Sequence, residues 1–82
     1  MSIEGIDVSH WQGRIDWARV AKAGIKFAII KATEGTTYVD PLYATNRRLA
    51  RKAGLVVGAY HFFRPDAPGR AQAEHFLRVA SP

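Results

Sequence analysis

The chain has 82 residues, of which 48% are hydrophobic and 23% are charged, and its formal net charge is +5. This length holds one small core, and the composition is typical of a globular chain, which excludes disorder, collagen and a coiled coil. No apolar run approaches the roughly 18 residues that a membrane span requires, so we expect no membrane insertion. The absence of cysteine excludes a disulfide scaffold and a thiol nucleophile.

The sequence predicts neither a metal site nor a cofactor. His10, His61 and His75 lie far apart along the chain, and none belongs to an H-E-x-x-H or His-x-His arrangement. The first residues run directly into a strand-like segment, so no signal peptide is visible at this end.

The excess of basic residues favours anionic partners such as nucleic acid, anionic lipid or an acidic wall polymer. Four of the cations, Arg47, Arg48, Arg51 and Lys52, alternate with apolar residues in one predicted helix. That pattern is typical of the solvated face of an amphipathic helix, and no nucleic-acid motif accompanies it. We therefore expect no nucleic-acid binding.

Three apolar runs, residues 3–8, 27–33 and 55–63, predict strands, and a segment with helical periodicity follows each. The first helix is expected to begin at Asp16 as N-cap and to end at Gly24. The second is expected to be capped by Asp40, with Pro41 in its first turn and Gly54 after its end. The third is expected over residues 68–80 behind Asp66, with an inward face made of Ala73, Phe76, Leu77 and Ala80.

This β-α-β-α-β-α order predicts an α/β fold whose parallel strands are joined by right-handed crossovers. Three strands with helices on one face leave the other face and both edges exposed, which invites pairing with something else. We interpret residues 1–82 as a single partial domain, the N-terminal half of a TIM-like β/α barrel. A two-layer fold that stands alone is the alternative.

Two of the seven carboxylates have no simple structural explanation. Asp16, Asp40 and Asp66 are expected as helix caps, and Glu4 and Glu74 at solvated places.

The remaining two, Asp7 and Glu34, are candidate catalytic or auxiliary carboxylates. Alternation turns Asp7 to the face opposite Ile6 and Val8, the interior of the barrel. Glu34 follows the neighbouring strand, and neighbouring strands lie about 4.8 Å apart, so both groups can face one substrate. Alternatively, Asp7 binds loop amides and Glu34 pairs with Lys31 or an arginine.

Aromatic residues crowd the end of the third strand, and sugar rings stack on such surfaces. Tyr60 and Phe62 share one face by alternation, which we assign to the interior, and His61 and Phe63 share the other. Tyr60, Phe62 and His61 are candidate substrate-binding residues, although His61 can equally be a hydrogen-bonded core histidine. The adjacent Ser9 and His10 do not form a nucleophilic pair, because no nucleophile elbow is present.

Three ordered motifs, GIDVSHWQG from Gly5, FAIIKATEGT from Phe27 and AGLVVGAYHFF from Ala53, make the chain resemble glycoside hydrolase family 25. This resemblance implies a muramidase-type lysozyme that cuts the β-1,4 bond between N-acetylmuramic acid and N-acetylglucosamine in peptidoglycan. It implies that Asp7 is an active-site aspartate and that Glu34 and Tyr60 line the same groove. It also implies an extracellular or cell-wall location, with peptidoglycan strands as the partner.

The resemblance places the family's proton-donating glutamate in an Asp-x-Glu motif on a fourth strand. No two acidic residues in this sequence are spaced i, i+2. Because glycoside hydrolysis needs an acid and a second carboxylate, we expect this chain alone to be inactive.

Two further interpretations stay open. The first is a non-catalytic peptidoglycan-binding module in which Tyr60, Phe62 and Trp11 stack on glycans. The second is a self-assembling half-barrel, a homo-oligomer that forms through exposed strand edges.

Overall fold

The computed structural model describes residues 3–80, so residues 1, 2, 81 and 82 of the predicted domain lie outside the described part. The described chain is a mixed α/β unit with one four-stranded sheet. Its elements in chain order are β1 (Gly5–Val8), a 3-10 helix η1 (His10–Gln12), α1 (Trp17–Lys22), β2 (Phe27–Glu34), β3 (Tyr38–Val39), α2 (Tyr43–Lys52), β4 (Val56–Phe62) and α3 (Gly69–Ala80). No helix among residues 3–80 is both long and apolar enough to cross a membrane.

Strand β2 lies at the centre of the sheet, with β1 and β4 parallel to it on either side. The three expected strands are thus parallel, as predicted, but the sheet also contains an unexpected short strand, β3, which pairs with the end of β2 in the antiparallel direction. A parallel neighbour needs a long crossover, whereas only residues 35–37 connect β2 to β3.

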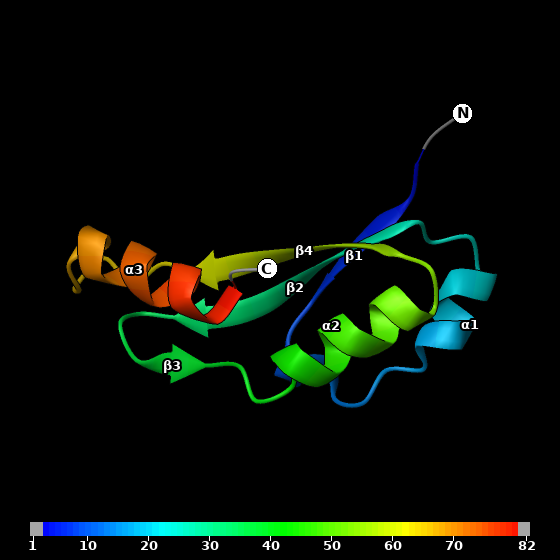
Figure 1. Cartoon of the computed structure of the whole chain (residues 1–82), viewed down its shortest axis with the longest axis horizontal. Coiled ribbons are helices and arrows are strands. Elements are labelled where there is room, and N and C mark those ends of the chain that lie inside the picture. The colour runs from blue at the N-terminus through cyan, green and yellow to red at the C-terminus, as the bar shows by residue number, and fades with distance from the viewer. Residues whose placement is uncertain (1–2, 81–82) are drawn as a thin grey trace.

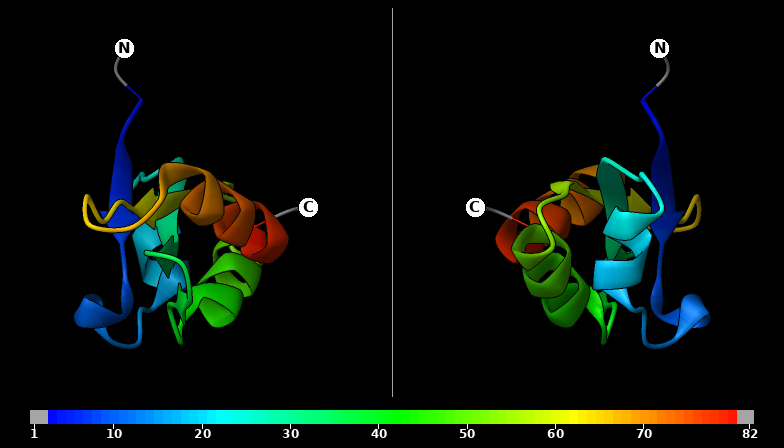
Figure 2. Two further views of the ribbon diagram at one scale, coloured as in Figure 1. Left: turned by 90° about the vertical axis from the view of Figure 1, so that its left-hand side faces the viewer. Right: turned by 90° about the vertical axis from the view of Figure 1, so that its right-hand side faces the viewer.

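All three α-helices lie on one face of the sheet (Figures 1 and 2). The core lies between them and the strands, and its buried residues are Val8, Trp17, Ala28, Ile30, Ala32, Tyr43, Ala50 and Leu55. We call the opposite side, which no helix covers, the open face. Strand residues that alternate with the core, such as Asp7 and Ile29, point to it.

The register between β2 and β4 shifts by one residue at Ala32. Lys31 pairs with Tyr60 and Thr33 pairs with His61, so β2 contains one residue more than β4 across this step. We call this feature the Ala32 bulge. An extra residue in one strand reverses the alternation of every later side chain in that strand.

The beginning of α1 is confirmed, because the Asp16 side chain accepts a hydrogen bond from the Arg19 amide at 3.1 Å. The beginning of α2 differs from the expectation. Its N-cap is Leu42, which makes no side-chain cap hydrogen bond, and Pro41 lies in the preceding turn. Asp40 does accept from the Leu42 amide at 2.9 Å, but its second oxygen binds His10, 30 residues away in sequence.

The predicted inward face of α3 is partly wrong. Ala73 and Leu77 are exposed, whereas the polar residues Gln72 and His75 are buried. Burial of polar side chains is tolerated where hydrogen bonds satisfy them. His75 meets this condition through the carbonyl of Tyr38 at 2.8 Å, and Gln72 meets it in the loop before α3.

Glycines follow α1 and α2, as the sequence predicts. Gly24 and Gly54 adopt φ of 94° and 93°, a conformation that L side chains rarely adopt.

We predict that Gly54→Ala lowers the free energy of unfolding by about 1–2 kcal/mol, because Ala pays the left-handed penalty at this φ. Gly69→Ala is the matched control: a methyl group would meet open space at both positions, and only Gly54 has a positive φ. Gly69→Ala is expected to be neutral or to stabilise by up to about 1 kcal/mol. Urea unfolding followed by circular dichroism measures both, and equal effects would contradict the explanation.

Candidate functional site

The Ala32 bulge brings two opposite charges together on the open face. In a regular strand, residues three apart point to opposite faces. Across the bulge, Lys31 and Glu34 share one face, and Lys31 Nζ donates to Glu34 Oε1 at 2.6 Å. Lys31 is only 4% exposed, so this carboxylate is the partner of a buried cation.

A second cation reaches Glu34 from the loop after β4. The guanidinium of Arg64 forms an ion pair with the other oxygen, Oε2, so each carboxylate oxygen has its own cation. The hydrogen bond from Lys31 is the largest cause of a lowered pKa for Glu34, and Arg64 lowers the pKa further against the opposing effect of burial. Glu34 is therefore a stable anion, which accepts hydrogen bonds and does not donate a proton.

Aromatic rings frame these charges. Lys31 Nζ lies 5.2 Å from the ring centroids of both Tyr38 and Phe62, and the guanidinium carbon of Arg64 lies 5.9 Å from that of Phe62. Cations at such distances are attracted to the ring faces. The aromatic and charged side chains thus hold one another in place.

Tyr60 and Phe62 lie on the open face, as alternation predicts, opposite Lys31 and Glu34 in the register. Burial is the main cause of a raised pKa for the Tyr60 phenol. The negative charges of Asp7 and Asp40 raise that pKa further, while Lys31 opposes them. Tyr60 therefore keeps its proton and can donate a hydrogen bond into the site.

Asp7 and Glu34 lie at different levels of the sheet. Asp7 is exposed and pairs with Ile29, and β1 ends one residue later, whereas Glu34 lies five residues further along β2. Their Cα atoms are therefore offset by about 13–16 Å along the strand direction. The spacing between neighbouring strands therefore does not by itself set the separation of the two carboxylates, because β2 continues beyond the end of β1.

Two adjoining hollows form the candidate site, and we call them together the groove. The first, of about 360 Å³, is lined by Ser9, Trp11, Lys31, Glu34, Tyr60, Phe62 and Arg64. The second, of about 450 Å³, is lined by His10, Trp11, Lys31, Glu34, Gly35, Thr36, Thr37, Tyr38 and Arg64. A larger hollow of about 840 Å³ lies beside β3 and α2 and shares none of the open-face residues.

His61 does not lie in the groove. Its ring is on the helix-covered face, where Nδ1 is 2.8 Å from Thr33 Oγ1 and Nε2 is 2.8 Å from Gln72 Oε1. The expected role of His61 in substrate binding therefore has no geometric support, and the alternative of a hydrogen-bonded core histidine fits its contacts.

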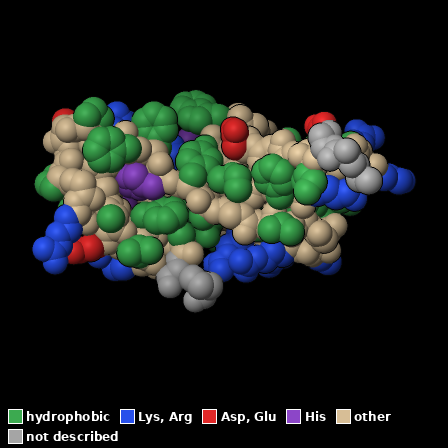
Figure 3. All heavy atoms as spheres, turned by 90° about the horizontal axis from the view of Figure 1, so that it is seen from above, with side chains coloured by type: hydrophobic (Ala, Val, Ile, Leu, Met, Phe, Trp, Pro, Cys, Tyr) green, Lys and Arg blue, Asp and Glu red, His purple; other side chains and the backbone are tan. Residues whose placement is uncertain are grey.

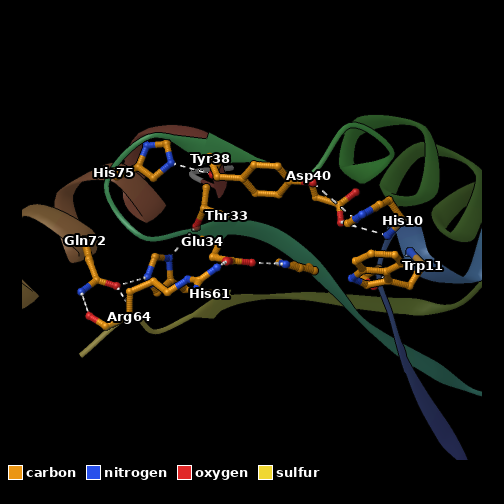
Figure 4. Close-up of polar contacts among 12 residues, drawn as sticks. His10, Trp11, Thr33, Glu34, Tyr38, Asp40, His61, Arg64, Gln72 and His75 are labelled. Carbon is orange, nitrogen blue, oxygen red and sulfur yellow. Dashed lines mark hydrogen bonds and ion pairs between the residues drawn. The ribbon is translucent and has the colours of Figure 1, made fainter. Parts of the chain in front are cut away.

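Sequence reasoning did not identify Gln72, which fixes the loop that carries Arg64. The Gln72 amide nitrogen donates to the carbonyls of Arg64 and Ala67, and its oxygen accepts from the Arg64 amide at 2.9 Å (Figure 4). Because the nitrogen donates, Oε1 is the acceptor for His61 Nε2–H. The sequence did contain a signal for this role, because Gln72 stands four residues before Phe76, at a position where helical periodicity favours an apolar residue.

Among residues 3–80, no group of three or more His, Asp or Glu side chains is arranged to hold a metal ion.

Charged side chains framed by aromatic rings lie at the carboxyl ends of the parallel strands, the edge of the sheet where β/α proteins build their sites. Comparison with known families identifies the protein further. The family model described as glycosyl hydrolases family 25 matches residues 6–81, and the chain belongs to this family.

Individual relatives agree with this membership. The chain is 56% identical over 75 residues to Lysozyme M1 of Streptomyces globisporus, an alignment that covers 90% of this chain and 26% of that protein. The structure of a bacterial lysozyme from Streptomyces coelicolor superposes with a TM-score of 0.93 at 52% identity, over 98% of this chain and 37% of that one. A family 25 glycosyl hydrolase from Bacillus anthracis gives 0.91 at 49% identity, over 94% and 36%.

The chain thus spans about a quarter to two fifths of the length of the curated relatives that it matches. The similarity to solved structures shows a fold like that of the family's lysozymes over this length.

We predict that Glu34→Gln lowers the free energy of unfolding at neutral pH by about 2 kcal/mol, because it leaves the buried Lys31 without a carboxylate. The control, Glu74→Gln, removes the exposed Arg70 pair and is expected to cost less than about 1 kcal/mol.

The stabilisation by Glu34 also depends on pH. The pKa of Glu34 is lowered on folding, so its contribution is complete above the unfolded value, near 4.5, and is lost as the pH falls through the folded pKa. The difference in urea midpoint between wild type and Glu34→Gln should therefore shrink from neutral pH towards about pH 3. An unchanged difference at both pH values would contradict this account of the pair.

Proposed function

We propose that this chain forms one wall of the glycan groove of a muramidase-type peptidoglycan hydrolase, and that the wall binds the glycan strand along the open face. The observation that most directly supports this proposal is the Lys31–Glu34–Arg64 cluster beside Tyr60 and Phe62. The names of relatives, Lysozyme M1 and an N,O-diacetylmuramidase of Chalaropsis, support a substrate made of alternating N-acetylmuramic acid and N-acetylglucosamine. On this proposal, the protein acts at the cell wall, outside the cytoplasm.

Each groove residue has a role suited to a sugar. The anionic Glu34 accepts hydrogen bonds from hydroxyl or acetamido N–H groups, and the protonated Tyr60 donates one. Phe62, with an exposed ring beside the groove, offers an apolar face to the C–H side of a pyranose. Asp7 is the auxiliary carboxylate at the end of β1, exposed to a substrate that lies over the sheet.

We further propose that this wall does not cleave the glycan by itself. Retaining and inverting hydrolysis both need two carboxyl groups between about 5 and 9.5 Å apart, one of them a protonated acid with a raised pKa. Glu34 has the opposite shift, since its two cations lower the pKa, and its backbone is well offset from Asp7. We propose that residues outside this unit supply the acid, in a TIM-like barrel to which the unit contributes the N-terminal half.

A peptidoglycan assay tests this function. We expect the wild-type chain to sediment with insoluble peptidoglycan but to release no reducing ends. Glu34→Gln should weaken sedimentation several-fold, because a charge-assisted acceptor is lost. Release of reducing ends by the wild type that disappears in Asp7→Asn or Glu34→Gln would show that these carboxylates suffice, and would overturn the proposal of an incomplete site.

The exposed edge of the sheet favours a second candidate, a half-barrel that assembles with a copy of itself. Among the described residues, β4 pairs only with β2, so its outer edge is unpaired. Figure 3 looks onto the upper edge of the sheet as drawn in Figure 1, and hydrophobic side chains gather there. Exposed apolar residues of β4 and its neighbours include Val56, Phe62, Phe63 and Leu77.

Light scattering over a range of concentrations distinguishes this candidate. Self-assembly predicts an average mass that rises with concentration, and a return to the monomer mass in Val56→Lys, because an edge lysine opposes strand pairing. A monomer mass at every concentration would exclude the self-assembling half-barrel and leave the glycan-binding wall.

A further inference from the structure

One large aromatic side chain at the rim of the groove has no role in the core. Trp11 is 80% exposed, the highest value among the exposed large hydrophobic residues of the described chain, and it lines both hollows of the groove. An exposed apolar side chain of this size next to a polar site is typical of a binding surface.

The turn that carries Trp11 is fixed by its own hydrogen bonds. The Ser9 amide donates to Gln12 Oε1 at 2.6 Å, and Ser9 Oγ accepts from the Trp11 amide at 3.3 Å. Together with the Gln12 amide, these contacts form a capping box around η1. The backbone under Trp11 is therefore held in one conformation.

A buried carboxylate then fastens this turn to the rest of the molecule. Asp40, only 2% exposed, accepts from the His10 amide at 2.9 Å and from His10 Nδ1–H at 3.1 Å. Its other oxygen accepts from the Leu42 amide. A buried carboxylate is costly unless donors surround it, so this arrangement strongly restricts where His10 can lie.

The His10 ring in turn supports the indole. The ring centroids of His10 and Trp11 are 4.6 Å apart with an interplanar angle of 35°, and the Tyr38 ring centroid is 6.1 Å from that of His10 (Figure 4). One face of Trp11 is thus backed by His10 while the residue remains open to solvent. A ring supported in this way loses less side-chain entropy when it binds a ligand than an unsupported ring would.

We propose that Trp11 is a stacking platform for a pyranose ring of the glycan at the rim of the groove, and that His10 and Asp40 are its positioning residues. This inference rests on the proposed function of the groove and adds a binding position that lies beyond Glu34, Tyr60 and Phe62.

Charge and ring chemistry identify the occupant as an uncharged sugar ring. The face of an indole is negative, which suits the slightly positive C–H face of a pyranose or an organic cation. Lys31 and Arg64 line the same hollows, and the chain carries +5, so a cation is repelled. A β-linked N-acetylhexosamine can stack on Trp11 while its polar groups reach the Glu34 cluster.

Tryptophan fluorescence measures this directly, because the chain has two tryptophans in opposite environments. Trp17 is 3% exposed and donates to Asn46 at 3.2 Å, so acrylamide quenches mainly Trp11. Tetra-N-acetylchitotetraose is the probe. We expect it to shift the emission and to protect the wild-type chain from acrylamide.

Variants then separate the possible outcomes. Trp11→Ala should raise the Kd for the tetrasaccharide about fivefold, and Trp11→Phe should recover part of the loss. Phe63→Ala, which removes another exposed ring that lines neither hollow, should leave the Kd unchanged. If the wild type binds but Trp11→Ala binds equally well, this inference is wrong and the proposed groove stands. If the wild type binds no tetrasaccharide by calorimetry, the proposed glycan binding fails and the inference with it.

The role of His10 has a separate readout. His10→Ala should lower the steady-state anisotropy of Trp11 and weaken tetrasaccharide binding, with a circular dichroism spectrum like that of the wild type. His10→Phe keeps a ring under the indole and should restore much of the anisotropy. Unchanged anisotropy in His10→Ala would show that His10 does not position Trp11.

Discussion

The extra residue at Ala32 in the central strand is the constraint on which the groove depends. Without it, Lys31 and Glu34 would point to opposite faces, and one of the two charges would be buried among the helices without its partner. With it, both charges face the open side. The Ala32 carbonyl also accepts the Asp40 amide at 2.8 Å, a bond that continues the antiparallel pairing of β2 with β3 and anchors the segment that leads to Asp40.

Two buried polar side chains hold the loops that surround this cluster. Gln72 on α3 binds the backbone of the loop that carries Arg64, and Asp40 before α2 binds the turn that carries Trp11. Each is at most 2% exposed, and each would destabilise the protein if its partners were lost. The loops at the rim of the open face are therefore fixed by buried polar side chains, one on α3 and one in the segment between β3 and α2.

The two faces of the sheet therefore have different roles in the molecule. The covered face holds the apolar core, and the open face holds charged and aromatic groups on a backbone that the core keeps rigid. Close packing also occurs on the open face at Gly5, where the Phe27 ring occupies the space that a side chain would need. On this open face Glu34 is held as an anion by its two cations, so it accepts hydrogen bonds and does not act as a proton donor.

The sequence by itself determined the order of the three parallel strands and the three α-helices, most of their bounds, the face shared by Tyr60 and Phe62, and membership of the family. These follow from local periodicity, turn residues and contiguous motifs. It did not determine the Ala32 bulge, the short β3 strand or the level of Asp7 relative to Glu34, since register depends on pairing between segments distant in sequence. The sequence placed Asp40 near the start of a helix, because that signal is local. Its bond to His10 could not be predicted, because the bond forms only when β1 and β2 lie side by side. Local physics decides which elements form, and tertiary pairing decides which polar side chains meet.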